Sequence, residues 1–303
     1  MAKITAAMVA ELRGKTGAGM MDCKKALSET DGNIDDAIDF LRKKGLSAAA
    51  KKSGRVAAEG AIVAAGAANV GVIVEVNAET DFVAKNDAFC NFAAGIAQVV
   101  VDQRPADLAE LQQDAFPGSG RTVAEELTHQ IATIGENINI RRFACRSVDA
   151  GVVEHYVHAG GKIGVIVELT TASTSEAVSA TARQLAMHIA AAAPQYLCRE
   201  QVPAEIVDKE KEIMRVKALE SGKPENIVDK IIAGQINKFY GEICLLEQAF
   251  VIDPDRRINQ VVAGLAKEIG AEVELSGYDR YMLGEGIEKR VDDFAAEVAQ
   301  LTK

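Results

Sequence analysis

The chain carries the same five-residue motif twice. Residues 71–75 and residues 164–168 both read GVIVE, at an offset of 93 positions (164 − 71). The same offset continues without a gap and matches Phe92 with Leu185 in the segment that follows. The β-branched motif is typical of a buried strand, and the apolar spacing after it is typical of a helix. The fold must therefore accommodate two copies of one strand–turn–helix unit.

The two copies differ at the turn between strand and helix. The first reads TDFV at residues 80–83, and the second reads STSE at residues 173–176. A Phe on an exposed turn either tucks under the helix or is held out for a partner. Because Ser175 stands where the first copy has Phe82, the shared scaffold does not require an apolar side chain there. We therefore expect a binding role for this loop, although diverged copies can also differ through their packing neighbours.

Charge and composition narrow the classes of ligand. The formal net charge is −10, from 34 Lys and Arg against 44 Asp and Glu, which argues against nucleic acid as the main ligand. The basic residues between Arg42 and Arg55 are expected to form a solvated surface. Five separated cysteines without a CxxC pair predict free thiols in a reducing compartment. With no signal-peptide pattern and no bilayer-spanning apolar run, we expect a cytoplasmic protein without membrane contact.

Motifs for covalent chemistry are missing from the sequence. It contains no phosphate-binding loop, no HExxH metal motif and no nucleophile elbow. His188 stands among Ala and Met and is predicted to be a core or edge histidine. We therefore predict no catalytic residue, no cofactor, no metal site and no enzymatic activity, although a site assembled from distant residues stays an alternative.

The order of elements predicts an α+β fold built from five modules. These are a three-helix bundle with its linker (1–54), a first antiparallel sheet-plus-helix subdomain (55–150), a second one (151–202 and 241–283), an inserted antiparallel helical hairpin (203–240) and a C-terminal helix (284–303). The hairpin interrupts a repeat that is complete without it, so we favour an arm for dimerisation or partner contact over packing on the same core.

Two surface features are also expected. One of Met20 and Met21 is predicted to be in the core of the bundle, and the other is a candidate contact, because methionine adapts to irregular partner surfaces. The Pro- and Gly-containing segment 101–120 is predicted to be an exposed loop.

Motifs along the whole chain resemble the bacterial elongation factor Ts family. They are GAGMMDCKKAL (17–27), TDFVAKN (80–86), IGENINIRR (134–142), HIAA (188–191) and GEGIEK (284–289). Several long motifs in the right order are much more specific than any one alone. The resemblance implies a UBA-like N-terminal bundle and a hairpin of the coiled-coil type, and segment 101–120 is expanded relative to the family.

The resemblance also implies a guanine-nucleotide exchange factor for elongation factor Tu, in both its GDP-bound and nucleotide-free states. The exchange loop would be Thr80, Asp81, Phe82, Val83, Ala84 and Lys85, with Phe82 as a wedge and Asp81 as a polar anchor that together disturb the partner's Mg²⁺ site. Further partner contacts would be Met20, Met21, Lys24, His158 and Phe294. The alternative is an adaptor or assembly protein that uses the same surfaces without changing nucleotide release.

Overall fold

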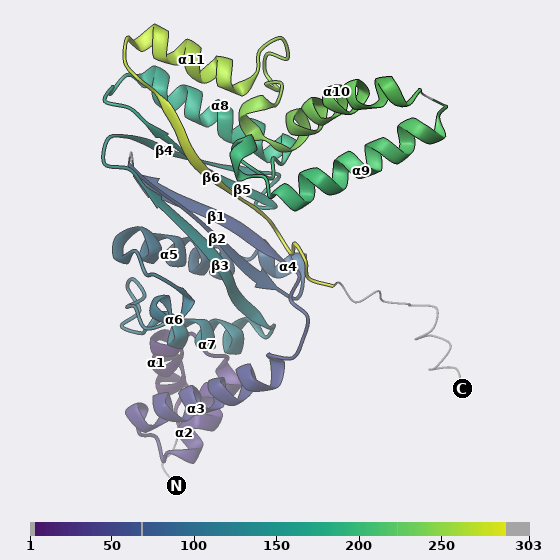
Figure 1. Cartoon of the computed structure of the whole chain (residues 1–303). Helices are drawn as coiled ribbons and strands as arrows, with labels where there is room; N and C mark the ends of the chain where they lie inside the picture. The colour runs from purple at the N-terminus through teal and green to yellow at the C-terminus, as the bar shows by residue number, and fades with distance from the viewer. Residues whose placement is uncertain (1–3, 68, 223, 289–303) are drawn as a thin grey trace, which may run out of the picture. The chain divides into compact units, whose positions relative to one another are not determined.

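The computed structural model describes residues 4–67, 69–222 and 224–288, and within them the predicted α+β class is confirmed. Figure 1 shows the elements in chain order: α1 (Ala6–Thr16), α2 (Met20–Glu29), α3 (Ile34–Lys52), β1 (Glu59–Ala67), β2 (Val70–Ala78), α4 (Asp81–Ala84), α5 (Asp87–Gln103), α6 (Leu108–Leu111), α7 (Val123–Ile134), β3 (Ile138–Ser147), β4 (Gly151–His158), β5 (Ile163–Thr170), α8 (Glu176–Ala192), α9 (Ala204–Glu220), α10 (Glu225–Ile243), α11 (Ile258–Ile269) and β6 (Glu274–Met282). Short 3₁₀ turns lie at Arg199–Gln201 and Leu245–Glu247. None of the helices in these ranges is both long and apolar enough to cross a bilayer.

The chain forms two compact units. One comprises the described part of 1–63, 74–143 and 282–303, and the other comprises 64–73 and 144–281. The boundaries between them fall inside strands β1, β2, β3 and β6. The five-module division expected from the sequence stays a prediction.

Each copy of the repeat contributes a three-stranded sheet. The strand orders are β1-β2-β3 and β4-β5-β6, so in both sheets a hairpin is extended by a strand that arrives after a helix. In the second sheet β4 and β5 run antiparallel, from Gly151 opposite Thr170 to His158 opposite Ile163. In the first sheet β2 is buried along its whole length, as expected for the GVIVE strand. The predicted pair of sheet-plus-helix units is therefore present.

The second copy has a continuous apolar core beneath two helices. α8 and α11 pack on the sheet through residues that include Val165, Val167, Leu185, Ile189 and Leu265. Figure 1 shows both helices on the same face of the β4-β5-β6 sheet.

The last strand differs from the sequence expectation. The sequence predicts the final strand at residues 271–275. In the structure it runs from Glu274 to Met282, because Gly270 ends α11 with a positive φ of 64° and the chain must turn first. Beyond Leu275 the strand is polar and lacks the alternating pattern. In this part of the strand, Asp279 forms an ion pair with Arg146 at 2.5 Å.

The three N-terminal helices enclose a small core of their own. Its buried members are Leu12, Cys23, Ala26, Leu27 and Ala37. The predicted linker is largely helical, because α3 continues to Lys52.

α3 crosses α7 closely at Gly45. A Cβ atom placed on Gly45 would lie 3.5 Å from the Cβ of Ala132. A methyl group at position 45 would therefore be in ordinary van der Waals contact with α7.

The segment 101–120 is not simply the exposed loop expected from the sequence. It includes α6, whose Leu111 is fully buried. The ring of Phe116 stacks on Phe92 of α5, with centroids 5.7 Å apart. These two apolar side chains fold the segment back onto its own unit.

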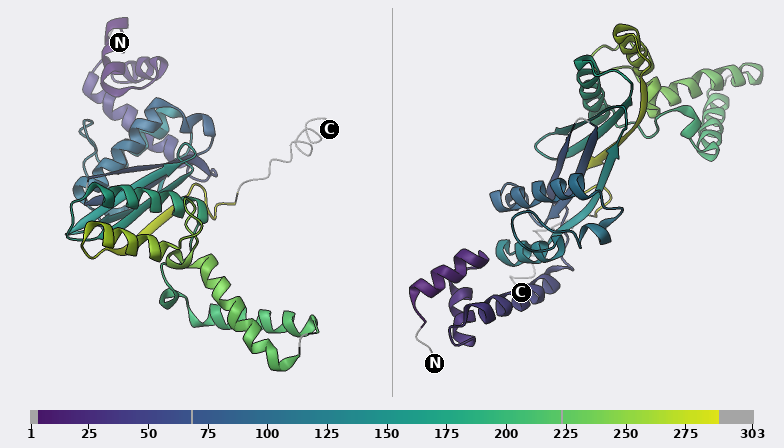
Figure 2. Two further views of the ribbon diagram at one scale, coloured as in Figure 1. Left: turned by 90° about the horizontal axis from the view of Figure 1, so that it is seen from above. Right: turned by 90° about the vertical axis from the view of Figure 1, so that its left-hand side faces the viewer.

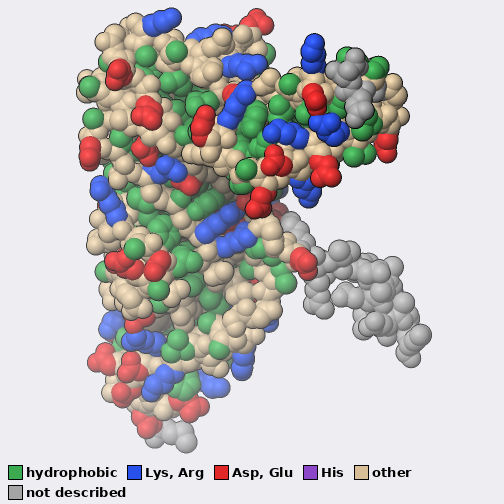
Figure 3. Space-filling view, in the orientation of Figure 1, with side chains coloured by type: hydrophobic (Ala, Val, Ile, Leu, Met, Phe, Trp, Pro, Cys, Tyr) green, Lys and Arg blue, Asp and Glu red, His purple; other side chains and the backbone are tan. Residues whose placement is uncertain are grey.

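Two helices occupy the segment where the sequence predicts an inserted hairpin. Helices α9 and α10 pack against each other, and the two views of Figure 2 show them as a pair. Ala218, Val228 and Ile232 form its apolar contact near the turn. Figure 3 shows charged side chains of both signs between hydrophobic ones on its surface. Dimerisation through this arm stays a prediction, and the expected C-terminal helix with Phe294 lies outside the described residues.

Candidate functional site

The exchange-loop sequence forms a one-turn helix, α4, between β2 and α5. Thr80 is its N-cap and accepts a hydrogen bond from the Val83 N–H at 3.4 Å. The turn closes through the Lys85 and Asn86 N–H groups, which donate to the carbonyls of Phe82 and Val83. Asn86 then caps α5 by accepting from the Ala88 N–H at 2.8 Å. Capping side chains therefore fix the turn at both ends.

Phe82 and Val83 are neighbours on this turn but differ in exposure. Val83 is buried, whereas Phe82 is 81% exposed, the largest value among the exposed large apolar side chains described. Of the two alternatives for Phe82, tucking under the helix is therefore wrong, and the ring is held out. Exposing a Phe forfeits about 1.5 to 3 kcal/mol of burial, so this orientation calls for an explanation outside the fold.

Charged side chains flank the exposed ring. Lys85 Nζ lies 2.8 Å from Asp81 Oδ2, across one turn, and both side chains are more than half exposed. Such a pair stabilises an exposed turn by only about 0.3 to 0.5 kcal/mol. Both charges therefore stay accessible to a partner at little cost in stability. Ala84, the remaining loop residue, is half-buried.

The start of the loop is tied to the turn between α7 and β3. The Thr80 N–H donates to Glu136 Oε2 at 3.0 Å, and the Thr80 hydroxyl donates to Glu136 Oε1 at 2.7 Å. In return, the Asn137 N–H donates to Glu79 Oε1 at 2.6 Å. These contacts do not follow from the sequence patterns. Their signal in the sequence is a helix-ending glycine, Gly135, followed at once by an acidic residue and a strand.

A buried carboxylate, that of Glu75, lies on β2, before the loop in the chain. Glu75 is fully buried and binds Arg141 at 2.9 Å and Arg142 at 2.6 Å, and it accepts the Gly284 N–H at 2.8 Å. Burial alone would raise the pKa of Glu75, but the hydrogen bonds from Gly284 and the two arginines outweigh it and leave the pKa below 4.5. Burial likewise works to lower the pKa of Arg142, but hydrogen bonds to Glu75 and Glu285 raise it overall.

The other predicted contact residues lie on separate elements. Met20 and Met21 begin α2 and are 60% and 76% exposed, so the expectation that one of them is in the core is wrong. The inward face of α2 starts only at Cys23, which leaves the first turn beyond the bundle core. Lys24 is exposed on the same helix. The structure thus brings these three residues together, in the unit that also holds α4.

Two histidines of the second unit behave differently from each other. His158, at the end of β4, is exposed, and its Nδ1 lies 2.9 Å from the Tyr156 hydroxyl. His188 is fully buried, as expected from the sequence, with Nε2 2.9 Å from Gln248 Oε1. Burial lowers the pKa of His188 below 6.5. His188 is therefore a satisfied core residue, whereas His158 is exposed to a partner.

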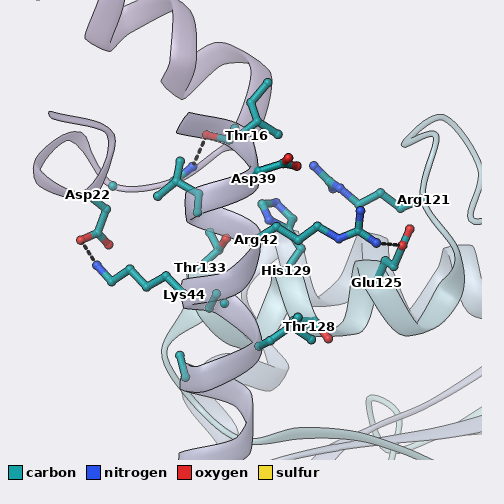
Figure 4. Close-up of a pocket in the computed structure, with 18 of the residues that line it drawn as sticks. Thr16, Asp22, Asp39, Arg42, Lys44, Arg121, Glu125, Thr128, His129 and Thr133 are labelled. Carbon is teal, nitrogen blue, oxygen red and sulfur yellow. Dashed lines mark hydrogen bonds and ion pairs between the residues drawn. The ribbon is translucent and has the colours of Figure 1, made fainter. Parts of the chain in front are cut away.

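A cavity of about 550 Å³ lies between α3 and α7 (Figure 4). Its charged walls are paired, Arg42 with Glu125 and Lys44 with Asp22. Burial and the nearby charge of Arg121 lower the pKa of His129, partly offset by Glu126. The balanced charges do not mark an anion site, and the described residues contain no cluster of three His, Cys, Asp or Glu that could hold a metal ion.

Comparisons with known proteins agree on one family. The family model described as Elongation factor TS matches residues 79–285, a span that includes the exchange loop and Glu136. A protein named Elongation factor Ts from Syntrophotalea carbinolica is 68% identical over 302 residues, covering 99% of this chain and all of the relative. Proteins of the same name from Magnetococcus marinus and Trichlorobacter lovleyi are 53% and 54% identical, covering 99% and 98% of this chain and 99% and 97% of their own lengths.

Proposed function

The chain belongs to the elongation factor Ts family, and on that premise we propose that it is a guanine-nucleotide exchange factor for elongation factor Tu in translation elongation. The observation that carries the proposal is the 81% exposure of Phe82 on a turn that is capped at both ends. An apolar ring held rigidly in solvent suits insertion into a partner.

In this mechanism Phe82 enters the GTPase domain of elongation factor Tu beside the nucleotide. The ring gains burial of about 1.5 to 3 kcal/mol and displaces packing that the partner needs to hold GDP and Mg²⁺. Removing the positive charge of Mg²⁺ from the phosphates weakens GDP further. This chain performs no covalent step, and linkage requires that GDP weaken the binding of the chain as much as the chain weakens GDP.

The remaining predicted residues serve docking in this proposal. Asp81 and Lys85 anchor the loop through charge, while Met20, Met21 and Lys24 offer an adaptable surface on α2. His158 and Phe294 would supply further contacts. The net charge of −10 suits a protein partner better than nucleic acid, and we place the reaction in the cytoplasm.

The test is the release rate of a fluorescent GDP analogue from elongation factor Tu. We expect strong acceleration by the parent protein and a loss of about ten- to a hundredfold in Phe82→Ala, corresponding to about 1.4 to 2.7 kcal/mol of lost wedge interaction. Ile252→Ala is the matched control, because Ile252 is also an exposed apolar side chain, at 51%, outside the loop. It should behave like the parent.

The opposite result identifies the competing function. If the parent, shown to be folded by circular dichroism, binds elongation factor Tu without accelerating release, the exchange proposal fails and the adaptor function takes its place.

A further inference from the structure

We propose that Glu136 is the positioning residue of the exchange loop, holding α4 so that Phe82 meets the partner in one orientation. This inference rests on the proposed exchange function. Glu136 does not need to touch the partner, because it acts through Thr80.

Both oxygens of the Glu136 carboxylate are used by Thr80. Oε1 accepts the Thr80 hydroxyl at 2.7 Å, and Oε2 accepts the Thr80 N–H at 3.0 Å. Since the hydroxyl gives its proton to Glu136, its lone pairs face the Val83 N–H, which donates to it at 3.4 Å. The carboxylate thus orients the capping hydroxyl and fixes the first residue of the turn.

Glu136 is itself held in place from two sides. Gly135 ends α7 with a φ of 91°, a conformation that favours glycine and directs the chain into the turn. Asn137 is buried and donates its side-chain amide to the Arg55 carbonyl at 2.7 Å and its backbone N–H to Glu79 at 2.6 Å. Each of the two segments therefore carries a glutamate that accepts a backbone N–H of the other, which gives a rigid reciprocal contact.

The second copy of the repeat provides an independent argument. There, Ile269-Gly270 ends α11 as Ile134-Gly135 ends α7, with the same left-handed cap. The next residue is Ala271, so the position equivalent to Glu136 has no carboxylate, and Glu272, one residue later, is exposed. That copy also lacks a Phe at its junction, where Ser175 stands. The scaffold therefore forms without this carboxylate, and the carboxylate occurs only in the copy with the exposed Phe.

A rigid turn matters because the loop must displace partner packing. A flexible loop would lose conformational entropy when it orders on insertion, and this loss would raise the free-energy barrier to nucleotide exchange. Binding through other surfaces would be left largely intact. Glu136 should therefore influence the maximal rate of GDP release more than the concentration of protein that gives half of it.

The experiment compares Glu136→Gln with the parent in the GDP-release assay, over a range of protein concentrations. Gln keeps the size of the side chain but replaces one of the two acceptor oxygens with an NH2 donor, so the observed arrangement of one Thr80 donor on each oxygen cannot form. We expect the maximal rate to fall about tenfold, the effect of losing one charge-assisted hydrogen bond, with the half-saturating concentration within about twofold of the parent. Amide hydrogen exchange over residues 80–86, followed by mass spectrometry, should become faster.

Two Thr80 variants separate positioning from general loss of structure. Thr80→Ser keeps both donors to Glu136 and should lose much less of the maximal rate than Thr80→Val. Thr80→Val keeps the shape of the side chain but removes the hydroxyl. Because Thr80→Val and Glu136→Gln remove the same interaction, the decrease in maximal rate in the double variant should be smaller than the sum of the two single decreases.

The outcomes are distinct. An unchanged maximal rate in Glu136→Gln, with Phe82→Ala impaired, overturns the positioning role and leaves the proposed function standing. A rise in the half-saturating concentration alone also overturns it, because Glu136 would then contribute to binding only. A parent that does not accelerate release removes both proposals.

Discussion

The two copies of the repeat build the same stretch differently. In the second copy, α8 is one continuous helix, Glu176–Ala192. At the equivalent positions the first copy has two helices, because α4 ends at Ala84 and α5 begins at Asp87. The break falls where the copies also differ in burial: Val178 is 2% exposed, whereas the side chain of its counterpart Lys85 is 74% exposed.

This difference shows how a repeated scaffold can acquire a projecting loop. A buried Val in the first turn ties α8 to its core, so the helix runs straight from its cap. Lys85 cannot be buried there, and Asn86 starts a new helix by capping it. The preceding turn is then free to leave the helix axis and present Phe82. The break in the helix is therefore part of the site.

Exchanging the residues at the break should give the largest effect. Val178→Lys places a charge in the apolar core of the second copy and should lower the free energy of unfolding by about 3 kcal/mol or more. The reciprocal Lys85→Val loses only an exposed ion pair and should change it by at most about 0.5 kcal/mol. Urea denaturation monitored by circular dichroism measures both. Similar losses in the two variants would show that burial does not separate the copies.

Replacing the equivalent glutamates of the two GVIVE motifs should give the next largest difference in the free energy of unfolding. Glu75 is fully buried with two arginines, whereas its counterpart Glu168 is partly exposed and lies 3.4 Å from Arg146. At pH 7, Glu75→Gln should lower the free energy of unfolding by about 2 to 3 kcal/mol, because it weakens charge-assisted hydrogen bonds in a buried network. Glu168→Gln should cost less than about 1 kcal/mol.

The Glu75 effect should also depend on pH in a fixed direction. Its pKa in the folded state lies below the ordinary 4.5, so the ionised form stabilises the fold. That contribution is complete above about pH 4.5 and is lost as the pH falls toward the folded-state pKa. The difference between parent and Glu75→Gln, measured by urea denaturation from pH 7 to pH 3, should therefore shrink in acid. A constant difference would contradict an ionised Glu75.

Local spacing was enough to predict most elements of the fold. The sequence TVAE at residues 122–125 predicts a capping box, which forms between Thr122 and Glu125. Apolar spacing predicts a helix near residues 176–192, and α8 lies there. Both follow from interactions within one or two turns, which neighbouring residues determine. The exposure of Phe82 followed from comparing the copies, because the equivalent Ser175 showed that the scaffold does not need the ring.

The long-range contacts that hold the site could not be predicted from the sequence. Thr80 and Glu136 are 56 residues apart, and Glu75 and Arg141 are 66 apart. Both pairs meet only because β3 joins the sheet of β1 and β2, and spacing carries no information about which strands become neighbours. The error at Met20 and Met21 has a related cause, since α2 extends beyond the three-helix core at its first turn.

The smallest of the expected effects concerns the middle of the helices. Gly95 on α5 corresponds to His188 on α8. A Cβ on Gly95 would lie 2.4 Å from the Phe116 ring, which the segment 101–120 brings over the helix. At position 188 the second copy instead buries a histidine bonded to Gln248. The lack of a side chain at position 95 therefore makes room for a segment that the second copy does not have.

The change in the free energy of unfolding caused by Gly95→Ala should therefore have opposite signs with Phe and with Ala at position 116. In the parent background the new methyl group overlaps the Phe116 ring and should lower the free energy of unfolding by about 1 kcal/mol. In a Phe116→Ala background the overlap is gone, and the same change should raise it by about 0.5 to 1 kcal/mol, because Ala favours a helix over Gly. Urea denaturation of the four proteins measures the cycle. The same loss in both backgrounds would mean that Gly95 serves the helix itself and not the approach of Phe116, and the contrast with His188 would lose its physical basis.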